Sequence, residues 1–274
     1  MTSDDLHAVS PVLRTRGATL SFGERTLWSG LDLDVMPGEF ITVLGANGSG
    51  KSTLLKAALG LQRLSSGTIE VLGRPATRGD RRIGYVPQQR LIAPGTPMRG
   101  RDLVGLGVDG HRPGIRIRGR RAVAAQVDEA IAAVGAQAFA GRPIGQLSGG
   151  EQQRLRVAQA LVSDPALLLC DEPLISLDLH QQHAVSRLVD ERRRSRGTPV
   201  LFVTHDINPV LPMTDRVLYF AGGQHRLGPP EEILRSEVLS ELYDTRVEVA
   251  RIGDRVVVLG APDHHEPHHV EVRA

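Results

Sequence analysis

The sequence predicts an α/β fold with a mixed, largely parallel sheet, an N-terminal antiparallel β subdomain and an inserted α-helical subdomain. Short apolar runs, such as "ALLLCDE" and "PVLFVTH", alternate with long helical patterns, which is typical of a buried parallel sheet. Residues 11–44 instead contain alternating apolar residues separated by turns, which favours antiparallel strands. A loop-rich and then helical stretch from about 89 to 164 interrupts the strands and predicts the inserted subdomain.

The elements follow from local patterns, taken in chain order. β-branched and alternating apolar residues between "GER" and "MPGE" turns predict the first strands, and later apolar runs predict the rest. Strands are expected at 12–22, 26–35, 39–45, 67–73, 81–86, 166–172, 199–205 and 215–223. Helices are expected at 48–61, 122–135, 151–162 and 178–196. Residues 245–260 are expected to form a hairpin that turns at Gly253 and Asp254.

Composition excludes several classes of protein. With 274 residues, 41% hydrophobic and 23% charged, the chain has enough apolar surface for a full core. Aromatic residues make up 3%, which argues against a stacking platform for nucleic acid, so no nucleic-acid partner is expected. No apolar run is long enough for a membrane span, and the N-terminus does not resemble a signal peptide. We therefore expect a soluble, cytoplasmic protein, and a single cysteine agrees with a reducing compartment.

A glycine-rich loop, "GANGSGKST", lies between a predicted strand and a predicted helix. This order is the context that phosphate binding requires, because successive backbone N–H groups and the helix N-terminus converge on phosphate oxygens. Lys51 can reach the β- and γ-phosphates, and the Ser52 hydroxyl can join a Mg²⁺ shell. The predicted nucleotide-binding residues are Gly45, Ala46, Asn47, Gly48, Ser49, Gly50, Lys51, Ser52 and Thr53.

Two acids follow the second buried strand, in "ALLLCDEP". They lie at the carboxyl end of the strand, where an α/β sheet presents its ligands. Asp171 is suited to hold Mg²⁺, and Glu172 is suited to orient or deprotonate an attacking water. Adjacent strand residues face opposite ways, so we expect the two acids to do different jobs. With the glycine-rich loop they predict a P-loop NTPase core that binds a nucleotide with Mg²⁺, whereas Cys170 is interpreted as an apolar strand residue.

A second anion cradle is predicted in "LSGGEQQR". Ser148, Gly149 and Gly150 precede a helix, which again combines a hydroxyl group with backbone amides at a helix N-terminus. One nucleotide has no evident need for two such cradles in one chain. The economical solution is a homodimer in which each cradle caps the γ-phosphate bound by the other subunit.

These motifs resemble those of the ATP-binding-cassette (ABC) ATPases, from about residue 11 to residue 250. The resemblance implies a phosphate loop at 45–52, a signature at 147–151, and Asp171 and Glu172 as the Mg²⁺ and catalytic acids. It also implies a γ-phosphate-sensing glutamine, a switch histidine, a protomer-joining aspartate and an adenine-stacking aromatic, which are Gln88, His205, Asp178 and Phe22. The catalytic set is then Glu172, His205 and Gln88, and the Mg²⁺ set is Ser52, Gln88 and Asp171.

The resemblance also implies partners and a location. A cassette with no fused membrane segment is expected to pair with a second copy and to dock on two polytopic permease subunits, at the inner face of the membrane. "THDINPV" and "LYDTRVEV" look like the ATPase subunits of bacterial zinc and manganese importers that use a solute-binding protein. The expected function is therefore that of an ATP-hydrolysing motor for zinc or manganese import.

Other functions remain open at this stage. An importer of iron–siderophore complexes or another small solute would share most of these motifs. A soluble ABC ATPase that acts on DNA or the ribosome belongs to a different class, but such relatives usually carry long coiled coils, zinc inserts or tandem cassettes, which are not visible here. A small-molecule kinase that uses the same phosphate loop is contradicted by the signature. One departure from the family is Ile175, where a serine is common, and we assign it no role.

The expected organisation is an ATPase domain at 1–245 with its helical subdomain at about 89–164, a hairpin at 246–262 and a polar tail at 263–274. The tail, "DHHEPHHVEV" with two more residues, contains imidazoles among carboxylates, which are zinc-type ligands. Pro267 separates two histidine pairs, so the tail has no helical ligand geometry. Two readings stay open: a tail that binds no metal, or a weak zinc site formed by His264, His265, His268 and His269.

Overall fold

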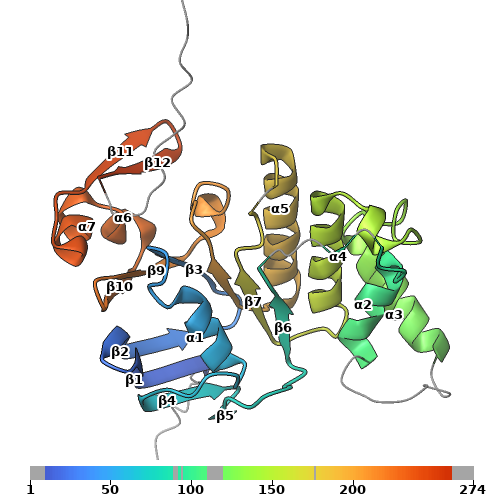
Figure 1. The fold of residues 1–274 in the computed structure, drawn as a ribbon, viewed down its shortest axis with the longest axis horizontal. Coiled ribbons are helices and arrows are strands. Elements are labelled where there is room, and N and C mark those ends of the chain that lie inside the picture. Colours follow the sequence, from blue (N-terminus) through green and yellow to red (C-terminus); the bar gives the residue numbers. More distant parts are fainter. Residues whose placement is uncertain (1–9, 89–91, 94, 110–119, 176, 261–274) are drawn as a thin grey trace, which may run out of the picture.

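The computed structural model describes residues 10–88, 92–93, 95–109, 120–175 and 177–260 (Figure 1). Two sheets and a C-terminal hairpin carry the strands, and the helices lie against the larger sheet. Four strands form an antiparallel sheet in the order β2-β1-β4-β5. They are β1 (Leu13–Phe22), β2 (Arg25–Val35), β4 (Ser66–Val71) and β5 (Arg74–Pro75). This sheet is the predicted N-terminal β subdomain.

The central sheet has six strands in the order β10-β9-β3-β8-β7-β6. They are β3 (Phe40–Gly45), β6 (Ile83–Val86), β7 (Leu167–Asp171), β8 (Val200–Val203), β9 (Arg216–Ala221) and β10 (Gln224–Gly228). Neighbouring strands run parallel except β10, which pairs antiparallel with β9. The predicted fold class is therefore confirmed, and the apolar runs are indeed strands buried on both faces.

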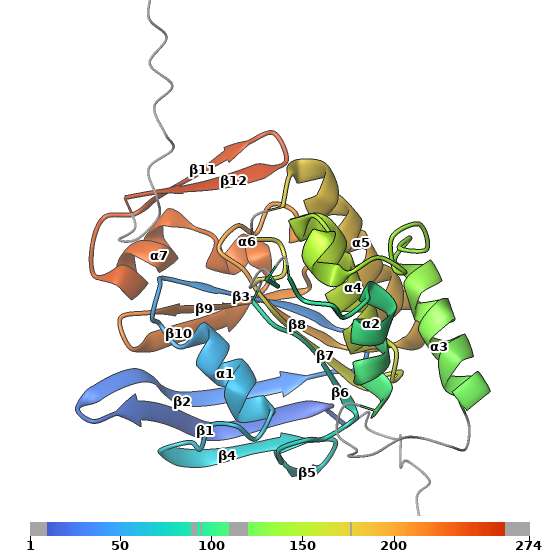
Figure 2. The same ribbon diagram turned by 45° about the vertical axis from the view of Figure 1, so that its right-hand side comes forward.

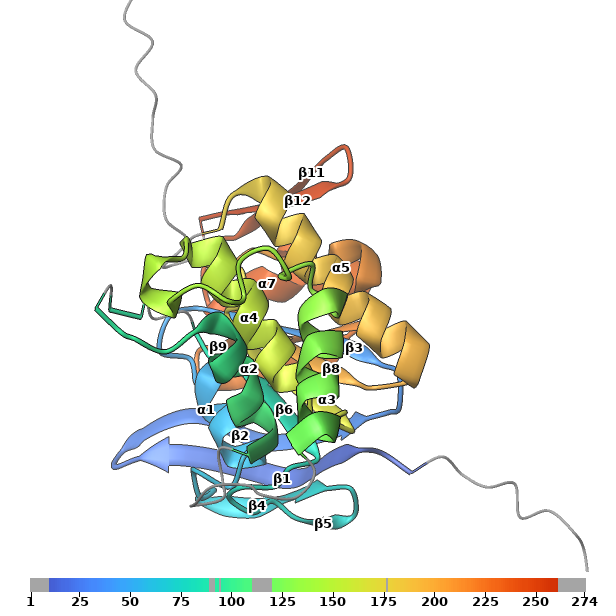
Figure 3. The same ribbon diagram turned by 90° about the vertical axis from the view of Figure 1, so that its right-hand side faces the viewer.

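A group of helices lies on one side of the central sheet (Figure 3). Three of them, α2 (Gly100–Asp109), α3 (Arg120–Ala133) and α4 (Gly149–Leu161), come between β6 and β7 in the chain, as the sequence predicts. A short 3₁₀ helix, η1 (Ile144–Gln146), precedes α4, and α5 (Leu179–Arg196) follows β7. The opposite face is covered by α1 (Lys51–Ala58), which packs between the two sheets.

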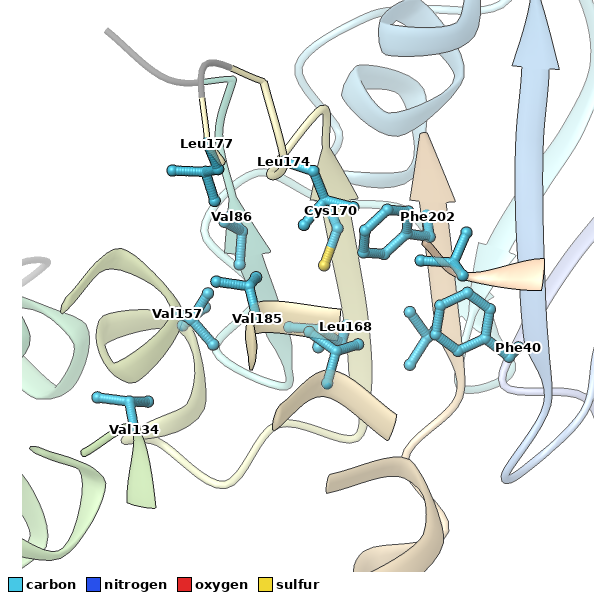
Figure 4. Close-up of a cluster of buried hydrophobic side chains, with 14 of the residues drawn as sticks. Phe40, Val86, Val134, Val157, Leu168, Cys170, Leu174, Leu177, Val185 and Phe202 are labelled. Carbon is cyan, nitrogen blue, oxygen red and sulfur yellow. The ribbon is translucent and has the colours of Figure 1, made fainter. Parts of the chain in front are cut away.

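Strand β7 shows how the sequence builds this layered core. Leu167 and Leu169 belong to the cluster that contains α1 and the antiparallel sheet, whereas Leu168 and Cys170 belong to the cluster under the helices. Figure 4 shows the second cluster, in which Cys170 lies beside Phe202 of β8. Both faces of β7 are therefore apolar, and full burial of each leucine contributes about 1.5–3 kcal/mol. Burial also raises the pKa of the Cys170 thiol, which fits its interpretation as an apolar residue.

The C-terminal part of the described chain packs on the β9–β10 side of the sheet (Figure 2). It contains α6 (Pro230–Ile233), α7 (Ser236–Tyr243) and a hairpin of β11 (Glu248–Ile252) and β12 (Arg255–Leu259), whereas the short 3₁₀ helix η2 (Leu211–Met213) lies between β8 and β9 in the chain. The hairpin turns at Gly253 and Asp254, as predicted. A two-stranded hairpin is marginal by itself. Burial of Val247 and Val256, which are 2% and 6% exposed, fastens it to the domain.

Several boundaries differ from the predicted ones. The first helix begins at Lys51 and not at Gly48, because Gly48 and Gly50 adopt positive φ angles of 74° and 98° that a helix does not allow. The helix predicted from residue 178 begins at Leu179, with Asp178 as its N-cap. Strands β5 and β10 were missed because one is two residues long and the other, "QHRLG", is polar.

Candidate active site

The register of the central sheet brings the predicted site residues to one edge. Val203 of β8 pairs with Val43 of β3 on one side and with Asp171 of β7 on the other. On the next strand, Val86 of β6 pairs with Cys170. The glycine-rich loop follows β3, His205 follows β8, Glu172 follows β7 and Gln88 follows β6. Four neighbouring strands thus end at the same edge of the sheet, and the residues that follow them all lie at one site.

The glycine-rich loop, residues 45–53, turns tightly between β3 and α1. An added Cβ atom at Gly45 would lie 2.1 Å from the carbonyl oxygen of Phe220, and one at Gly50 would lie 2.6 Å from Nε1 of Trp28. That indole nitrogen donates to the carbonyl oxygen of Gly50 (3.4 Å). Arg25 donates to the carbonyl oxygen of Gly48 (3.2 Å). Two side chains of β2 therefore hold the loop, and the close approach of Trp28 requires glycine at residue 50.

Lys51 is folded back into this loop. Its Nζ atom donates to the carbonyl oxygens of Gly45 (2.6 Å) and Ala46 (2.9 Å), and the side chain is buried. Burial lowers the pKa of Lys51, while the charges of Glu172 and Asp171 oppose this shift. The loop thus holds an ammonium group among backbone carbonyl oxygens, at the N-terminus of α1.

Asp171 faces α1, as the alternation along β7 requires. Its Oδ1 atom accepts a hydrogen bond from the Ser52 hydroxyl (2.7 Å), and its Oδ2 atom accepts one from the Tyr85 hydroxyl (3.3 Å). Burial raises the pKa of the Asp171 carboxyl, and the two hydrogen bonds act against that rise. Tyr85 was missed by sequence reasoning, although it stands in the "YVPQ" segment that contains Gln88.

Glu172 lies just beyond the end of β7 and points elsewhere. It has a positive φ of 48°, which is rare for a residue with a side chain. Oε2 accepts a hydrogen bond from Nε2 of Gln88 (2.7 Å), and Oε1 contacts Nε2 of His205. Burial raises the pKa of Glu172, but His205, Gln88 and the charge of Lys51 outweigh it, so the net shift is downward. The two acids therefore face different partners, as predicted, and Glu172 is held as a carboxylate.

The second predicted cradle lies at the start of α4. Ser148 caps the helix: its hydroxyl accepts from the backbone N–H of Glu151 (3.3 Å), and the Glu151 carboxylate accepts from the N–H of Ser148 (2.7 Å). An added Cβ atom at Gly150 would lie 2.3 Å from the Gln181 side chain, so glycine lets α4 approach α5. Helix α4 lies among α2, α3 and α5, whereas α1 lies between the sheets (Figures 1 and 2). The two cradles are separate within one chain.

The remaining predicted residues are more peripheral. Phe22 ends β1 and is 52% exposed, a large ring open to solvent. The Asp178 carboxylate accepts from the backbone N–H of Gln181 (2.8 Å) as the N-cap of α5. The four tail histidines, His264, His265, His268 and His269, lie outside the described residues. Among the residues that the structure does describe, there is no cluster of three His, Cys, Asp or Glu side chains suited to a metal, and no helix that could span a membrane.

An ammonium group on a glycine-rich loop, a hydroxyl bound to an acid, and a second acid beside a histidine and a glutamine converge at one sheet edge. This fold and site define a P-loop ATPase. The family model described as "ABC transporter" matches residues 28–175. The chain belongs to the ABC transporter family, as the sequence resemblance indicates.

Relatives of the chain span nearly its full length. It is 31% identical over 251 residues to the manganese transport system ATP-binding protein MntB of Halalkalibacterium halodurans, covering 92% of this chain and 99% of the relative. It is 36% identical over 236 residues to the zinc import ATP-binding protein ZnuC of Paramagnetospirillum magneticum, covering 86% and 84%. It is also 36% identical over 255 residues to the hemin import ATP-binding protein HmuV of Pseudomonas aeruginosa, covering 89% and 97%.

Solved structures show the same fold. A chain of an ABC transporter described as metal-chelate type, in an inward-facing conformation, matches with a TM-score of 0.75 and 28% identity, covering 90% of this chain and 95% of that one. An ATP-binding cassette bound to ADP and Pi, in a dimeric post-hydrolysis state, matches with a TM-score of 0.67 and 27% identity, covering 79% and 98%.

Proposed function

We propose that this chain is the ATP-hydrolysing subunit of an importer for zinc or manganese. The observation that carries the proposal is the convergence of Lys51, Asp171, Glu172, Gln88 and His205 on one sheet edge, in a chain whose relatives include manganese and zinc transport ATPases. In this proposal the residues bind ATP, orient the attacking water and couple hydrolysis to conformational changes in partner subunits.

Nucleotide binding is assigned to the glycine-rich loop and Phe22. Lys51 exchanges the carbonyl oxygens of Gly45 and Ala46 for phosphate oxygens, and the N–H groups of residues 45–53 surround the phosphates. The hydroxyl of Ser49 supports this fit, because it is buried and has no hydrogen-bond partner in the described structure. The exposed ring of Phe22 stacks on the adenine, which is worth about 1–3 kcal/mol by analogy with other base–aromatic contacts.

The donor set at the sheet edge also fits Mg²⁺. Ser52 and Asp171 offer a hydroxyl and a carboxylate oxygen that are already in contact at 2.7 Å, and oxygen ligands of this kind are what Mg²⁺ prefers. When bound with ATP, Mg²⁺ neutralises charge on the phosphates. Tyr85 orients the Asp171 carboxylate from its other oxygen. Gln88 is the third proposed ligand, and here its amide donates to Glu172.

Hydrolysis is assigned to Glu172, with His205 and Gln88 beside it. Glu172 accepts a proton from the attacking water, and its lowered pKa keeps it in the basic form at neutral pH. His205 contacts the γ-phosphate, and Gln88 senses the phosphate from the strand next to Glu172. Both side chains already contact the Glu172 carboxylate. Loss of the γ-phosphate would therefore affect both the loop that carries Gln88 and the loop that carries His205, because Glu172 joins them.

A homodimer completes the site in this proposal. The separation of the cradle at Ser148, Gly149 and Gly150 from the glycine-rich loop supports it, since one chain does not bring the two together. The dimeric state of a structural neighbour bound to ADP and Pi supports it further. Asp178 lies at the start of α5 and joins the two protomers. ATP binding closes the dimer and hydrolysis opens it.

The dimer docks on two polytopic permease subunits at the inner face of the membrane, and a solute-binding protein delivers the cargo. We assign the ATPase domain to 1–245, with the helical subdomain at about 89–164 receiving the permease beyond Gln88. We assign the hairpin unit to 246–262, of which the structure describes residues up to 260. The relatives named for manganese and zinc support the cargo, and the hemin relative at similar identity supports a second candidate in iron-compound import.

Metal content in cells that normally make this chain tests the function. Deletion of the gene, under metal-limited growth, should lower cellular zinc or manganese. The wild-type chain should restore the metal, whereas Glu172→Gln should not. A loss of iron with normal zinc and manganese would replace the cargo with an iron compound. Normal metal content together with tight association of the chain with DNA or ribosomes would reject the transport function.

The His-rich tail is proposed as a weak zinc-sensing or buffering site made by His264, His265, His268 and His269. The support is chemical, because imidazoles next to carboxylates are zinc ligands. Zinc titration of the full chain and of a chain ending at Gly260 tests it. Equal affinity in the two proteins would leave the tail without a metal role.

A further inference from the structure

The loop that carries His205 has an internal brace. Thr204 donates from its hydroxyl to the carbonyl oxygen of Asp206 (2.9 Å) and accepts from the N–H of Asp206 (3.2 Å). The Asp206 carboxylate accepts from both the backbone N–H (2.9 Å) and the side-chain Nδ2 (2.7 Å) of Asn208. His205 is therefore held between residues that are hydrogen-bonded to one another, and Asn208 closes this arrangement.

Asn208 also reaches out of the loop to the C-terminal hairpin. Its Nδ2 atom donates to the carbonyl oxygen of Val256 (3.0 Å), and its Oδ1 atom accepts from the N–H of Val256 (2.8 Å). One side-chain amide thus pairs with both backbone groups of one residue, as a neighbouring strand would.

The hairpin geometry explains why these groups of Val256 are available. The turn has two residues, so Ile252 and Arg255 form the hydrogen-bonded pair that flanks it. The next pair, Arg251 and Val256, is a non-hydrogen-bonded pair, whose N–H and C=O groups point away from the partner strand. Val256 therefore presents both groups at the edge of β12, and Asn208 satisfies both.

This contact bridges a cavity of about 560 Å³ between the hairpin and the sheet edge. Gly45, His205 and Asn208 line this cavity, together with residues 256–260 of the hairpin. Within the part of the chain that the structure describes, both hydrogen bonds between residues 204–210 and the hairpin come from Asn208. On its other strand the hairpin is hydrogen-bonded to α7, where the N–H of Val249 donates to the Ser236 hydroxyl (2.9 Å).

We propose that Asn208 is a positioning residue for ATP hydrolysis, which ties the His205 loop to the C-terminal hairpin and so holds His205 against Glu172. The inference rests on the proposed function, because it takes His205 and Glu172 as the hydrolytic pair. Among the described residues, Asn208 makes no hydrogen bond with the glycine-rich loop, which includes Lys51. We therefore expect Asn208 to affect the rate of hydrolysis and not the affinity for ATP. A change in the position of the hairpin would then alter the rate of hydrolysis, although the hairpin itself does not contact ATP.

Steady-state ATPase kinetics and amide hydrogen exchange on the full chain test the proposal. Asn208→Ala should lower kcat about tenfold, because a displacement of about 1 Å at a catalytic group can cost about 100-fold and the loss of one brace should move His205 by less; KM for ATP should stay within about twofold. Exchange of the Val256 N–H should become faster at the same time. The matched control is Ser236→Ala, which loosens the hairpin on α7, speeds exchange at Val249 and leaves kcat unchanged.

Three outcomes would overturn the proposal: an unchanged kcat in Asn208→Ala despite faster exchange at Val256, unchanged exchange at Val256, or an equal loss of kcat in Ser236→Ala. If Asn208→Ala does not fold, Asn208→Ser takes its place, because its shorter side chain does not span both groups of Val256. Glu172→Gln and His205→Ala are measured alongside. Normal hydrolysis by these two variants would reject the proposed function itself, whatever Asn208→Ala does.

Discussion

Replacing Glu172 by glutamine removes one negative charge from the site with little change in shape. The carboxylate has a lowered pKa, so at neutral pH the wild-type residue is a base and the amide is not. The glutamine keeps an oxygen that can accept the hydrogen bond from Gln88, which is 2.7 Å in the wild-type structure. The substitution therefore tests the chemistry of residue 172 while leaving its packing largely intact.

The expected effect is on hydrolysis and not on binding. A positioned general base contributes about 10²–10⁴-fold to the rate. Loss of the base should therefore lower kcat by this factor, which corresponds to about 2.7–5.5 kcal/mol in the activation barrier. Binding of ATP should be unchanged or slightly tighter, because Lys51 and the glycine-rich loop are untouched and an anionic neighbour of the phosphates is gone.

The assay is single-turnover ATP hydrolysis together with equilibrium binding of a fluorescent ATP analogue. Size-exclusion chromatography with ATP should show the Glu172→Gln chain accumulating as a closed dimer. Glu237→Gln, at an exposed acid on α7, is the control for loss of one charge and should behave as wild type. Hydrolysis by Glu172→Gln at the wild-type rate would refute the assignment of the base, and a large loss of ATP affinity would mean that residue 172 serves binding.

Further predictions concern the loop and the surface. Lys51→Ala should weaken ATP binding by at least about tenfold in calorimetric titration, because an ammonium group next to phosphates is lost; unchanged affinity would contradict its role. Gly50→Ala should cost about 2–4 kcal/mol of unfolding free energy in urea, since its Cβ atom would lie 2.6 Å from an indole nitrogen and φ is 98°. Gly79→Ala, with φ of 80° and open space around it, should cost clearly less. The hydrogen bond from Arg82 lowers the pKa of Asp80 in the folded protein. The ionised Asp80 therefore stabilises the fold fully above its unfolded-state pKa of about 4, and this stabilisation is lost as pH falls through the lower, folded-state pKa. The difference in Tm between wild type and Asp80→Asn should therefore shrink between about pH 6 and pH 2, and a constant difference would contradict this.

The sequence predicts the parts of the structure that depend on local patterns. The core positions of β7 and β8 are apolar, and the spacing of the glycine-rich loop is diagnostic, so the fold class, the loop and the two acids follow from the residues alone. Gln88 and His205 were assigned through the resemblance to the family. The direction of Asp171 follows from alternation along β7. Contacts between distant segments do not follow in this way. Tyr85 is one of three tyrosines and nothing local marks its bond to Asp171, and the pairing of Asn208 with Val256 joins residues 48 positions apart.

Boundaries were harder to predict because they depend on single backbone angles. The helix after the loop begins three residues later than the pattern suggests, since Gly48 and Gly50 have positive φ angles. Glu172 diverges from Asp171 partly because β7 has already ended there and the chain turns through a left-handed residue. A propensity argument does not anticipate such a residue, because glutamate rarely adopts this conformation.

At Glu172, whose backbone is left-handed, the residue that function requires is not the one that would be most stable. A side chain in this region of backbone space costs roughly 1–2 kcal/mol, which glycine would not incur and asparagine would incur less. In a screen that selects for thermal tolerance alone, Glu172→Gly and Glu172→Asn should therefore be enriched. The enriched chains would fold better and would have discarded the acid that faces Gln88 and His205. Thermal selection of this protein thus needs an activity filter, because a residue with a strained backbone lies at the centre of its site.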